Sequence, residues 1–174
     1  PGLNALVSLK EKGNAMTFYH GSRKLFEKGF LLAPQADGYA KDPEVASLEA
    51  LFEGRRPQGK TARSNSVYLV TDPDLIDASG GYNDAVYTVL PRSVPEESDL
   101  AWYSEAHCEL ETDPPNMDRI TTCIDNYWAG TPFPDEDRRC PEYRTKWAEV
   151  TSMFELNVDH ADLQRISSGN AITR

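Results

Sequence analysis

Apolar residues recur along the chain at two different spacings, and each spacing predicts a type of secondary structure. In residues 3–12 and 42–53 the apolar side chains come three or four positions apart, which is the period of one face of an α-helix. Gly13 follows the first segment and Gly54 the second, while Pro43 opens the second, as expected at helix ends. We therefore expect an amphipathic helix in each segment.

Short runs rich in β-branched and aromatic residues predict strands elsewhere. The clearest run is residues 85–90, where apolar side chains occupy both faces, as is typical of a central strand. The other expected strands are residues 16–20, 66–71, 109–111, 119–126 and 147–154, the last continuing to Leu156. Residues 72–78, with Pro73 in the first turn, are expected to form a short helix.

The order of these segments predicts one domain. The chain shows no internal repeat and no linker long enough to divide it, and its 174 residues fit one domain of ordinary size. Antiparallel strands with few helices favour the α+β class. We therefore expect a single domain over residues 1–174, with two small antiparallel sheets packed face to face around a cleft and with flanking helices.

The charge balance narrows the choice of partners. Asp and Glu total 28 against 18 Lys and Arg, which gives a formal net charge of -10. Such a field repels phosphate backbones and anionic lipid headgroups, so nucleic acid is not an expected partner. No apolar run approaches the roughly 20 residues that span a bilayer, so no membrane span is expected either. An anionic ligand would need a local basic site.

The cysteines leave two interpretations open. Cys108, Cys123 and Cys140 form no CxxC pair, and His107 beside Cys108 lacks the spacing of a zinc site, so no metal is expected. Cys123 and Cys140 flank a proline-containing stretch that a disulfide would staple in a secreted protein. Free buried thiols are an equally good interpretation.

Three short polar motifs stand at the ends of expected strands. They are Tyr-His-Gly-Ser-Arg at 19–23, Arg-Ser-Asn-Ser-Val-Tyr-Leu at 63–69, and Glu-Leu-Glu at 109–111. In this order they resemble the ADP-ribosyltransferase family of bacterial toxins and their relatives, over roughly residues 18–129. The resemblance implies an ADP-ribosyltransferase-like fold whose two sheets enclose a central NAD cleft.

The motifs combine features of two branches of that family. Tyr-His at 19–20 stands where the cholera and pertussis group has Tyr-Arg, Ser-Asn-Ser at 64–66 matches its serine strand, and 109–111 matches its Glu-x-Glu motif. A His-Gly-Ser motif is instead typical of the diphtheria-like and poly-ADP-ribose polymerase branch, in which a tyrosine stacks on nicotinamide. Tyr68 stands in that tyrosine's place.

The chemistry of NAD cleavage suggests roles for the acidic residues. Breaking the bond between nicotinamide and ribose builds positive charge on the sugar, which a fixed carboxylate stabilises. We expect Glu111 to be that carboxylate and Glu109 to accept a proton from the incoming nucleophile. Glu105 is a rival for the first role, because one sequence does not determine the register of a loop. The resemblance gives Ser64 the task of orienting the catalytic carboxylate.

The remaining candidates would bind NAD. His20 is placed to hold ribose hydroxyls or a phosphate, and the backbone at Gly21 can approach the nicotinamide amide closely. Arg23 is the best-placed cation for the diphosphate. The resemblance adds Tyr68 and Ser66.

These motifs together imply a function. The resemblance implies an NAD-dependent mono-ADP-ribosyltransferase, a secreted toxin or effector that uses NAD as substrate and modifies an unknown host protein. Two alternatives stand beside it: an NAD glycohydrolase, and a catalytically inactive ADP-ribosyltransferase fold that binds a host protein. Histidine at position 20, where one branch has arginine, favours the inactive fold.

Overall fold

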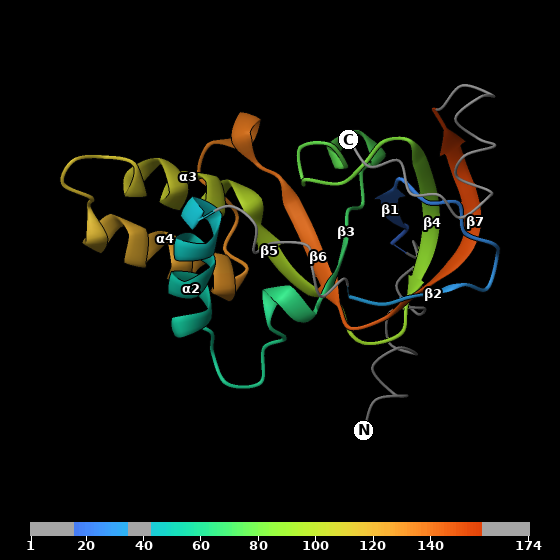
Figure 1. Cartoon of the computed structure of the whole chain (residues 1–174), viewed down its shortest axis with the longest axis horizontal. Coiled ribbons are helices and arrows are strands. Elements are labelled where there is room, and N and C mark those ends of the chain that lie inside the picture. The colour runs from blue at the N-terminus through green and yellow to red at the C-terminus, as the bar shows by residue number, and fades with distance from the viewer. Residues whose placement is uncertain (1–15, 35–42, 158–174) are drawn as a thin grey trace.

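The computed structural model describes residues 16–34 and 43–157, and in this part the fold is mixed α/β. It contains two antiparallel sheets and three α-helices in the described residues. Figure 1 shows the three-stranded sheet in the middle, with the helices on one side and the four-stranded sheet on the other. The expected helix over residues 3–12 lies outside the described residues.

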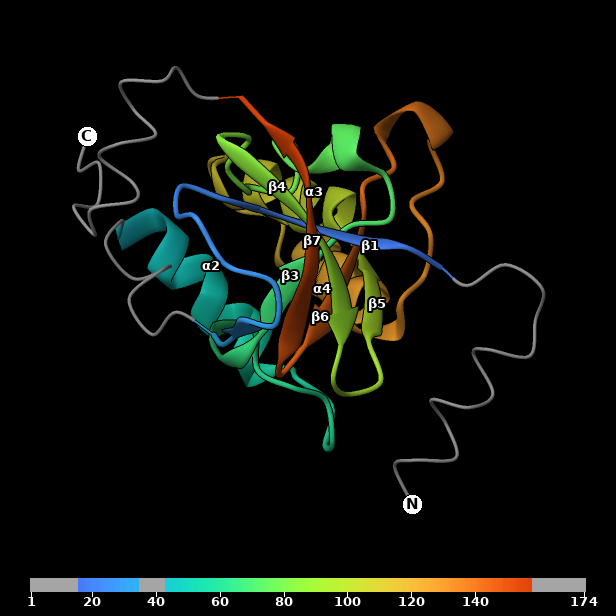
Figure 2. The same cartoon turned by 90° about the vertical axis from the view of Figure 1, so that its right-hand side faces the viewer.

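The four-stranded sheet has the order β1–β4–β7–β2. Its strands are β1 (Phe18–Ser22), β4 (Ala85–Pro91), β7 (Ala148–Leu156) and β2 (Leu31–Leu32). The prediction of a central strand at 85–90 is confirmed, because β4 pairs with β1 on one side and β7 on the other. Irregular pairing between β4 and β7 bends this sheet, which faces the viewer in Figure 2.

The three-stranded sheet has the order β3–β6–β5. It consists of β3 (Val67–Leu69), β6 (Pro141–Thr145) and β5 (Glu96–Asp99), of which only β3 was expected from the sequence. A bridge joins the two sheets: the backbone N–H of Tyr19 donates to the carbonyl of Val70 over 2.8 Å, and Val70 donates back over 3.1 Å. This bridge holds the first polar motif beside the second.

The expected face-to-face packing of the sheets is confirmed. Their facing side chains form one buried cluster, in which the Phe18 and Tyr143 rings meet edge to face at 5.2 Å. Its larger members are Phe18, Leu32, Val67, Leu69, Tyr87, Val89, Tyr143 and Val150. The buried apolar surface of this cluster holds β1 against β3, where the polar motifs lie.

The helices cover the outer face of the three-stranded sheet. They are α2 (Pro43–Gly54), α3 (Leu100–Leu110) and α4 (Met117–Ala129). The prediction of a helix over 42–53 is confirmed by α2, and a short 3₁₀ helix, Pro73–Leu75, stands where residues 72–78 were expected to be helical. None of the described helices is long and apolar enough to cross a membrane.

Two expected strands, residues 109–111 and 119–126, are wrong. The first lies at the end of α3, whose first turn is capped by the Asp99 side chain accepting from the Ala101 N–H. The second lies inside α4, which Asn116 caps at its start and Gly130, at φ 70°, ends. The Asn116 side chain satisfies a backbone donor that the start of a helix leaves open, and Gly130 donates to carbonyls that the end of the helix leaves open.

The disulfide interpretation of the cysteines is also corrected. Cys123 faces the helical core and Cys140 directly precedes β6, and both are buried free thiols, while Cys108 is an exposed one. Burial raises the pKa of the Cys140 thiol to about 11, and burial also raises the pKa of Cys123. These two cysteines therefore act as small buried apolar groups rather than as a staple.

Candidate functional site

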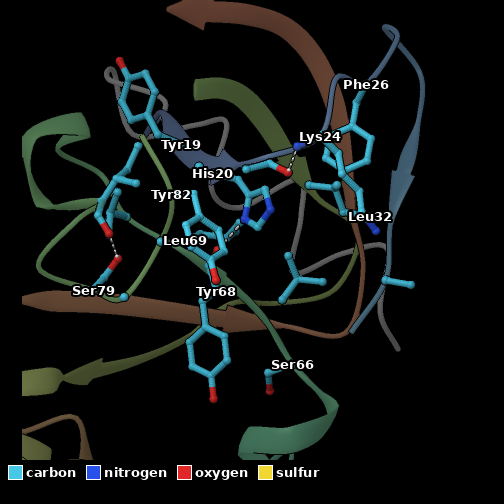
Figure 3. A pocket seen from close by; sticks show the side chains of 18 of the residues that line it. Tyr19, His20, Lys24, Phe26, Leu32, Ser66, Tyr68, Leu69, Ser79 and Tyr82 are labelled. Carbon is cyan, nitrogen blue, oxygen red and sulfur yellow. Dashed lines mark hydrogen bonds between the residues drawn. The ribbon is translucent and has the colours of Figure 1, made fainter. Parts of the chain in front are cut away.

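A cleft of about 610 Å³ opens between the two sheets. It is lined by residues of β1 and the segment after it, by residues of β2, and by parts of 63–70 and 76–82. Figure 3 shows His20 near its centre, with Lys24, Phe26 and Leu32 towards one side and Ser79 and Tyr82 towards the other. Ser64 and every residue expected to bind NAD line this cleft: His20, Gly21, Arg23, Ser66 and Tyr68.

The imidazole of His20 is neutral and has a defined proton position. Its Nδ1 lies 3.0 Å from the carbonyl oxygen of Tyr68, and because a carbonyl only accepts, Nδ1 carries the proton. Burial lowers the pKa of His20, and the hydrogen bond to the Tyr68 carbonyl only partly opposes this. At neutral pH the Nε2 atom therefore carries a lone pair that can accept a hydrogen bond from a hydroxyl.

The packing of the cleft wall requires glycine at position 21. A Cβ at this position would collide with the Ile76 side chain and with the carbonyl oxygen of Tyr82. Residues 76–82 therefore pack directly onto the backbone of β1 and form one wall of the cleft.

Tyr82, which sequence reasoning missed, presents an aromatic ring in this wall. Its side chain is 46% exposed, and the guanidinium carbon of Arg23 lies 3.8 Å from the ring centroid. The Nε of Arg23 is also 3.9 Å from the Asp84 carboxylate. An aromatic residue directly after the pair Gly80-Gly81 was the available signal, since glycines permit the backbone to approach a neighbouring strand closely.

The hydroxyl groups of the second motif hold the local turn. Tyr68 Oη donates to the carbonyl of Arg63 over 2.9 Å, and Ser66 Oγ donates to the carbonyl of Ala62 over 2.8 Å. Figure 3 shows the Tyr68 ring pointing away from His20. Ser64 is exposed in the short 3₁₀ helix Arg63–Asn65. The cleft thus includes the backbone of β3 and the edge of this turn.

The cleft is locally basic in an acidic protein. Its described lining residues include Arg23, Lys24 and Arg63 and no Asp or Glu, although the chain carries a net charge of -10. Because buried carboxylates already compensate Arg63, the cations that the described cleft offers to an anionic ligand are Arg23 and Lys24.

Arg63 connects the cleft to a network of buried charges. Its side chain is 1% exposed and lies 3.1 Å from Glu49 of α2 and 3.2 Å from Glu142 of β6. The Tyr127 hydroxyl of α4 contacts both the Arg63 guanidinium and the Glu142 carboxylate. The Glu53 carboxylate accepts the backbone N–H of Arg63 over 3.0 Å. The helices therefore hold the turn that forms part of the cleft.

The carboxylates expected from the sequence do not line the cleft. Glu109 is the next-to-last residue of α3 and Glu111 follows that helix, in the helical layer. Figure 1 shows α3 across the three-stranded sheet from β1. Glu105, also in α3, binds Arg138 and Arg119, and these hydrogen bonds lower the pKa of its carboxyl. The structure brings together the first two motifs but not the third.

Glu142 is a carboxylate that sequence reasoning missed. It lies on β6, next to β3, its side chain is 1% exposed, and it is bound to Arg63, which lines the cleft. The available sequence signal was the alternation of Glu142, Tyr143 and Arg144 after Pro141. Because side chains alternate along a strand, Tyr143 on the face turned to the other sheet places Glu142 on the opposite face. Among the residues described, no group of His, Cys, Asp and Glu side chains could hold a metal ion.

Compared with models of known protein families and with curated proteins, the chain matches none of them.

Proposed function

We propose that this protein is an NAD-dependent mono-ADP-ribosyltransferase that transfers ADP-ribose to a protein. The observation that carries this proposal is the cleft between the sheets, where a neutral imidazole and basic residues meet with no lining carboxylate in the described part of an acidic chain. NAD carries a diphosphate and ribose hydroxyls, which need cations and hydrogen-bond acceptors. The first two motifs, which both line this cleft, support the same choice of ligand.

The lining residues have complementary tasks in this proposal. His20 Nε2 accepts a hydrogen bond from a ribose hydroxyl, because Nδ1 is committed to the Tyr68 carbonyl. The backbone at Gly21 approaches the nicotinamide amide, and Arg23 and Lys24 meet the diphosphate. The bond between nicotinamide and ribose breaks with its electron pair leaving on nicotinamide, and a protein nucleophile then forms the new bond to ribose.

The reaction also needs a carboxylate to stabilise the positive ribose. Glu142 is our candidate because it binds Arg63 of the cleft wall, although its own side chain faces the helices, where the Tyr127 hydroxyl of α4 contacts it. Arg63 engages Glu142, so this role requires Arg63 to release a buried carboxylate, at a cost that the binding of NAD must offset.

A second candidate function has its own support. Because no carboxylate of the described residues lines the cleft, the protein is also suited to binding NAD or a host protein without turnover. NAD glycohydrolysis, with water as the acceptor, is the variant of the first proposal that needs no protein substrate.

Release of nicotinamide from NAD by the purified protein tests these proposals. We expect release, and we expect Glu142→Gln to slow it by on the order of 10²-fold or more, the usual effect of removing one fixed electrostatic partner. Glu111→Gln is the matched control, with release expected to persist. Loss in Glu111→Gln with release intact in Glu142→Gln would restore Glu111 as the carboxylate. Absence of release in the wild type, with NAD still bound, would favour the binding protein.

A further inference from the structure

The ring of Tyr82 is carried by a tightly packed segment. Gly21 and Gly81 both lie against Ile76, where a Cβ on Gly81 would come within 2.8 Å of the Ile76 Cγ2 atom. Ile76 itself is 1% exposed. Because this segment packs so closely on β1, its backbone carries Tyr82 at the wall of the cleft.

Arg23 covers one face of this ring through weak contacts. Its guanidinium carbon lies 3.8 Å from the ring centroid, and its nearest carboxylate among the described residues is Asp84, at 3.9 Å. That distance is beyond a hydrogen bond, and the two side chains are 41% and 36% exposed. Exposed ion pairs and cation–π contacts contribute little, so a ligand can displace the guanidinium.

We infer that Arg23 makes the cleft select ligands that carry both a planar ring and a phosphate over the planar ring alone. This inference rests on the proposed function. Both Arg23 and Tyr82 line the cleft, so a ring that stacks on the covered face of Tyr82 must displace the guanidinium. A phosphate on the same ligand gives the displaced guanidinium a charge-assisted contact in exchange. A neutral ring by itself offers no such exchange.

This selection bears on the products of NAD cleavage. Once the glycosidic bond is broken, nicotinamide no longer shares a molecule with the diphosphate. Arg23 then competes with free nicotinamide for the Tyr82 ring and favours its release. Arg23 is thus a specificity residue that distinguishes substrate from product.

Titration of two probes into wild type and Arg23→Ala tests the inference. The probes are nicotinamide and nicotinamide mononucleotide, which carries the same ring with a phosphate. We expect Arg23→Ala to bind nicotinamide about two- to fivefold more tightly, because the competing cation is gone. We expect it to bind the mononucleotide about tenfold or more weakly, because the charge-assisted contact is lost. Tighter binding of nicotinamide together with weaker binding of the mononucleotide is the result that this inference predicts for Arg23→Ala.

Two further variants serve as controls. Lys24→Ala removes a neighbouring cation of the same cleft that does not cover Tyr82, so it is expected to weaken only the mononucleotide. Tyr82→Ala is expected to weaken both probes. Thermal unfolding checks that each variant is folded.

Three outcomes would overturn the inference. They are unchanged or weaker binding of nicotinamide by Arg23→Ala, an equal gain for nicotinamide in Lys24→Ala, and no effect of Tyr82→Ala on either probe. In each case NAD binding by the wild type leaves the proposed function standing. A wild type that binds neither probe nor NAD overturns the proposed function, and this inference with it.

Discussion

Replacing Arg63 by methionine should destabilise the protein strongly, because it leaves a buried carboxylate without its cation. Arg63 and Glu142 are both 1% exposed, and the nitrogen and oxygen of the pair lie 3.2 Å apart. Methionine keeps much of the side-chain volume among the surrounding Phe52, Tyr103 and Tyr127 rings, so the main loss is electrostatic. Water cannot reach Glu142 to replace the guanidinium.

The expected size follows from what is known of buried ion pairs. Removing one partner of such a pair costs about 3–5 kcal/mol, a large share of the roughly 5–15 kcal/mol that holds a domain folded. Glu49 is 15% exposed and can be partly hydrated, so it adds less to the loss. For a chain of 174 residues each kcal/mol lowers Tm by about 2–4 °C, which predicts a decrease of roughly 6–20 °C.

Chemical denaturation of a double-mutant cycle provides the assay. The free energy of unfolding is measured for the wild type, Arg63→Met, Glu142→Gln and the double variant. The double variant should recover at least about half of the loss in Arg63→Met, because glutamine leaves no buried charge behind. Two results would refute the reasoning: a loss under about 1 kcal/mol in Arg63→Met, or a double variant as unstable as the sum of the single ones.

Three other predictions follow from the described residues. Gly21→Ala should cost about 1–3 kcal/mol in urea denaturation, because its Cβ would collide with the cleft wall, whereas Gly54→Ala, with open space around it, should stay within about 0.5 kcal/mol. Burial lowers the pKa of His20, so the unfolded state takes up this proton first and the free energy of unfolding should fall as pH drops below about 6.5. His20→Gln should flatten this dependence of the free energy of unfolding on pH, and an unchanged dependence would contradict the prediction. Thiol labelling at pH 8 should modify Cys108 rapidly, while burial and the raised pKa values keep Cys123 and Cys140 unreactive until urea is added. If only one cysteine per chain is labelled in urea without reductant, the other two form a disulfide and the prediction is wrong.

Local patterns of apolar residues were sufficient to predict some of the elements. The strand at 85–90 and the helix at 42–53 follow from periodicity, and the structure has both. Residues 119–126 were assigned to a strand from their composition, although Ile120, Cys123 and Ile124 recur at the helical period and are all buried in α4. In that segment periodicity was the better guide, because a helix buries one face regardless of whether its residues are β-branched.

The strands β5 and β6 could not be predicted in this way. Their buried residues include Ser98, Asp99, Glu142 and Arg144, which an apolar pattern does not detect. Arg144 is fully buried because the Thr61 carbonyl, the Ser98 hydroxyl and the Glu96 carboxylate meet its guanidinium. Such residues are buried only where distant elements supply partners, so their burial is a property of the assembled fold.

The same reason explains why residues of the cleft could be identified from the sequence and the buried Glu142 could not. His20 and Tyr68 are 48 residues apart, yet short motifs at two strand ends identified both, because each motif is contiguous. Glu142 has no such motif: its burial depends on Arg63, 79 residues earlier, and on a tyrosine of α4. The Glu-Leu-Glu triplet at 109–111 had the expected letters but lies at a helix end, where its side chains are in the helical layer. A carboxylate whose position depends on a distant cation can be found only once the sheet that brings the two together is known.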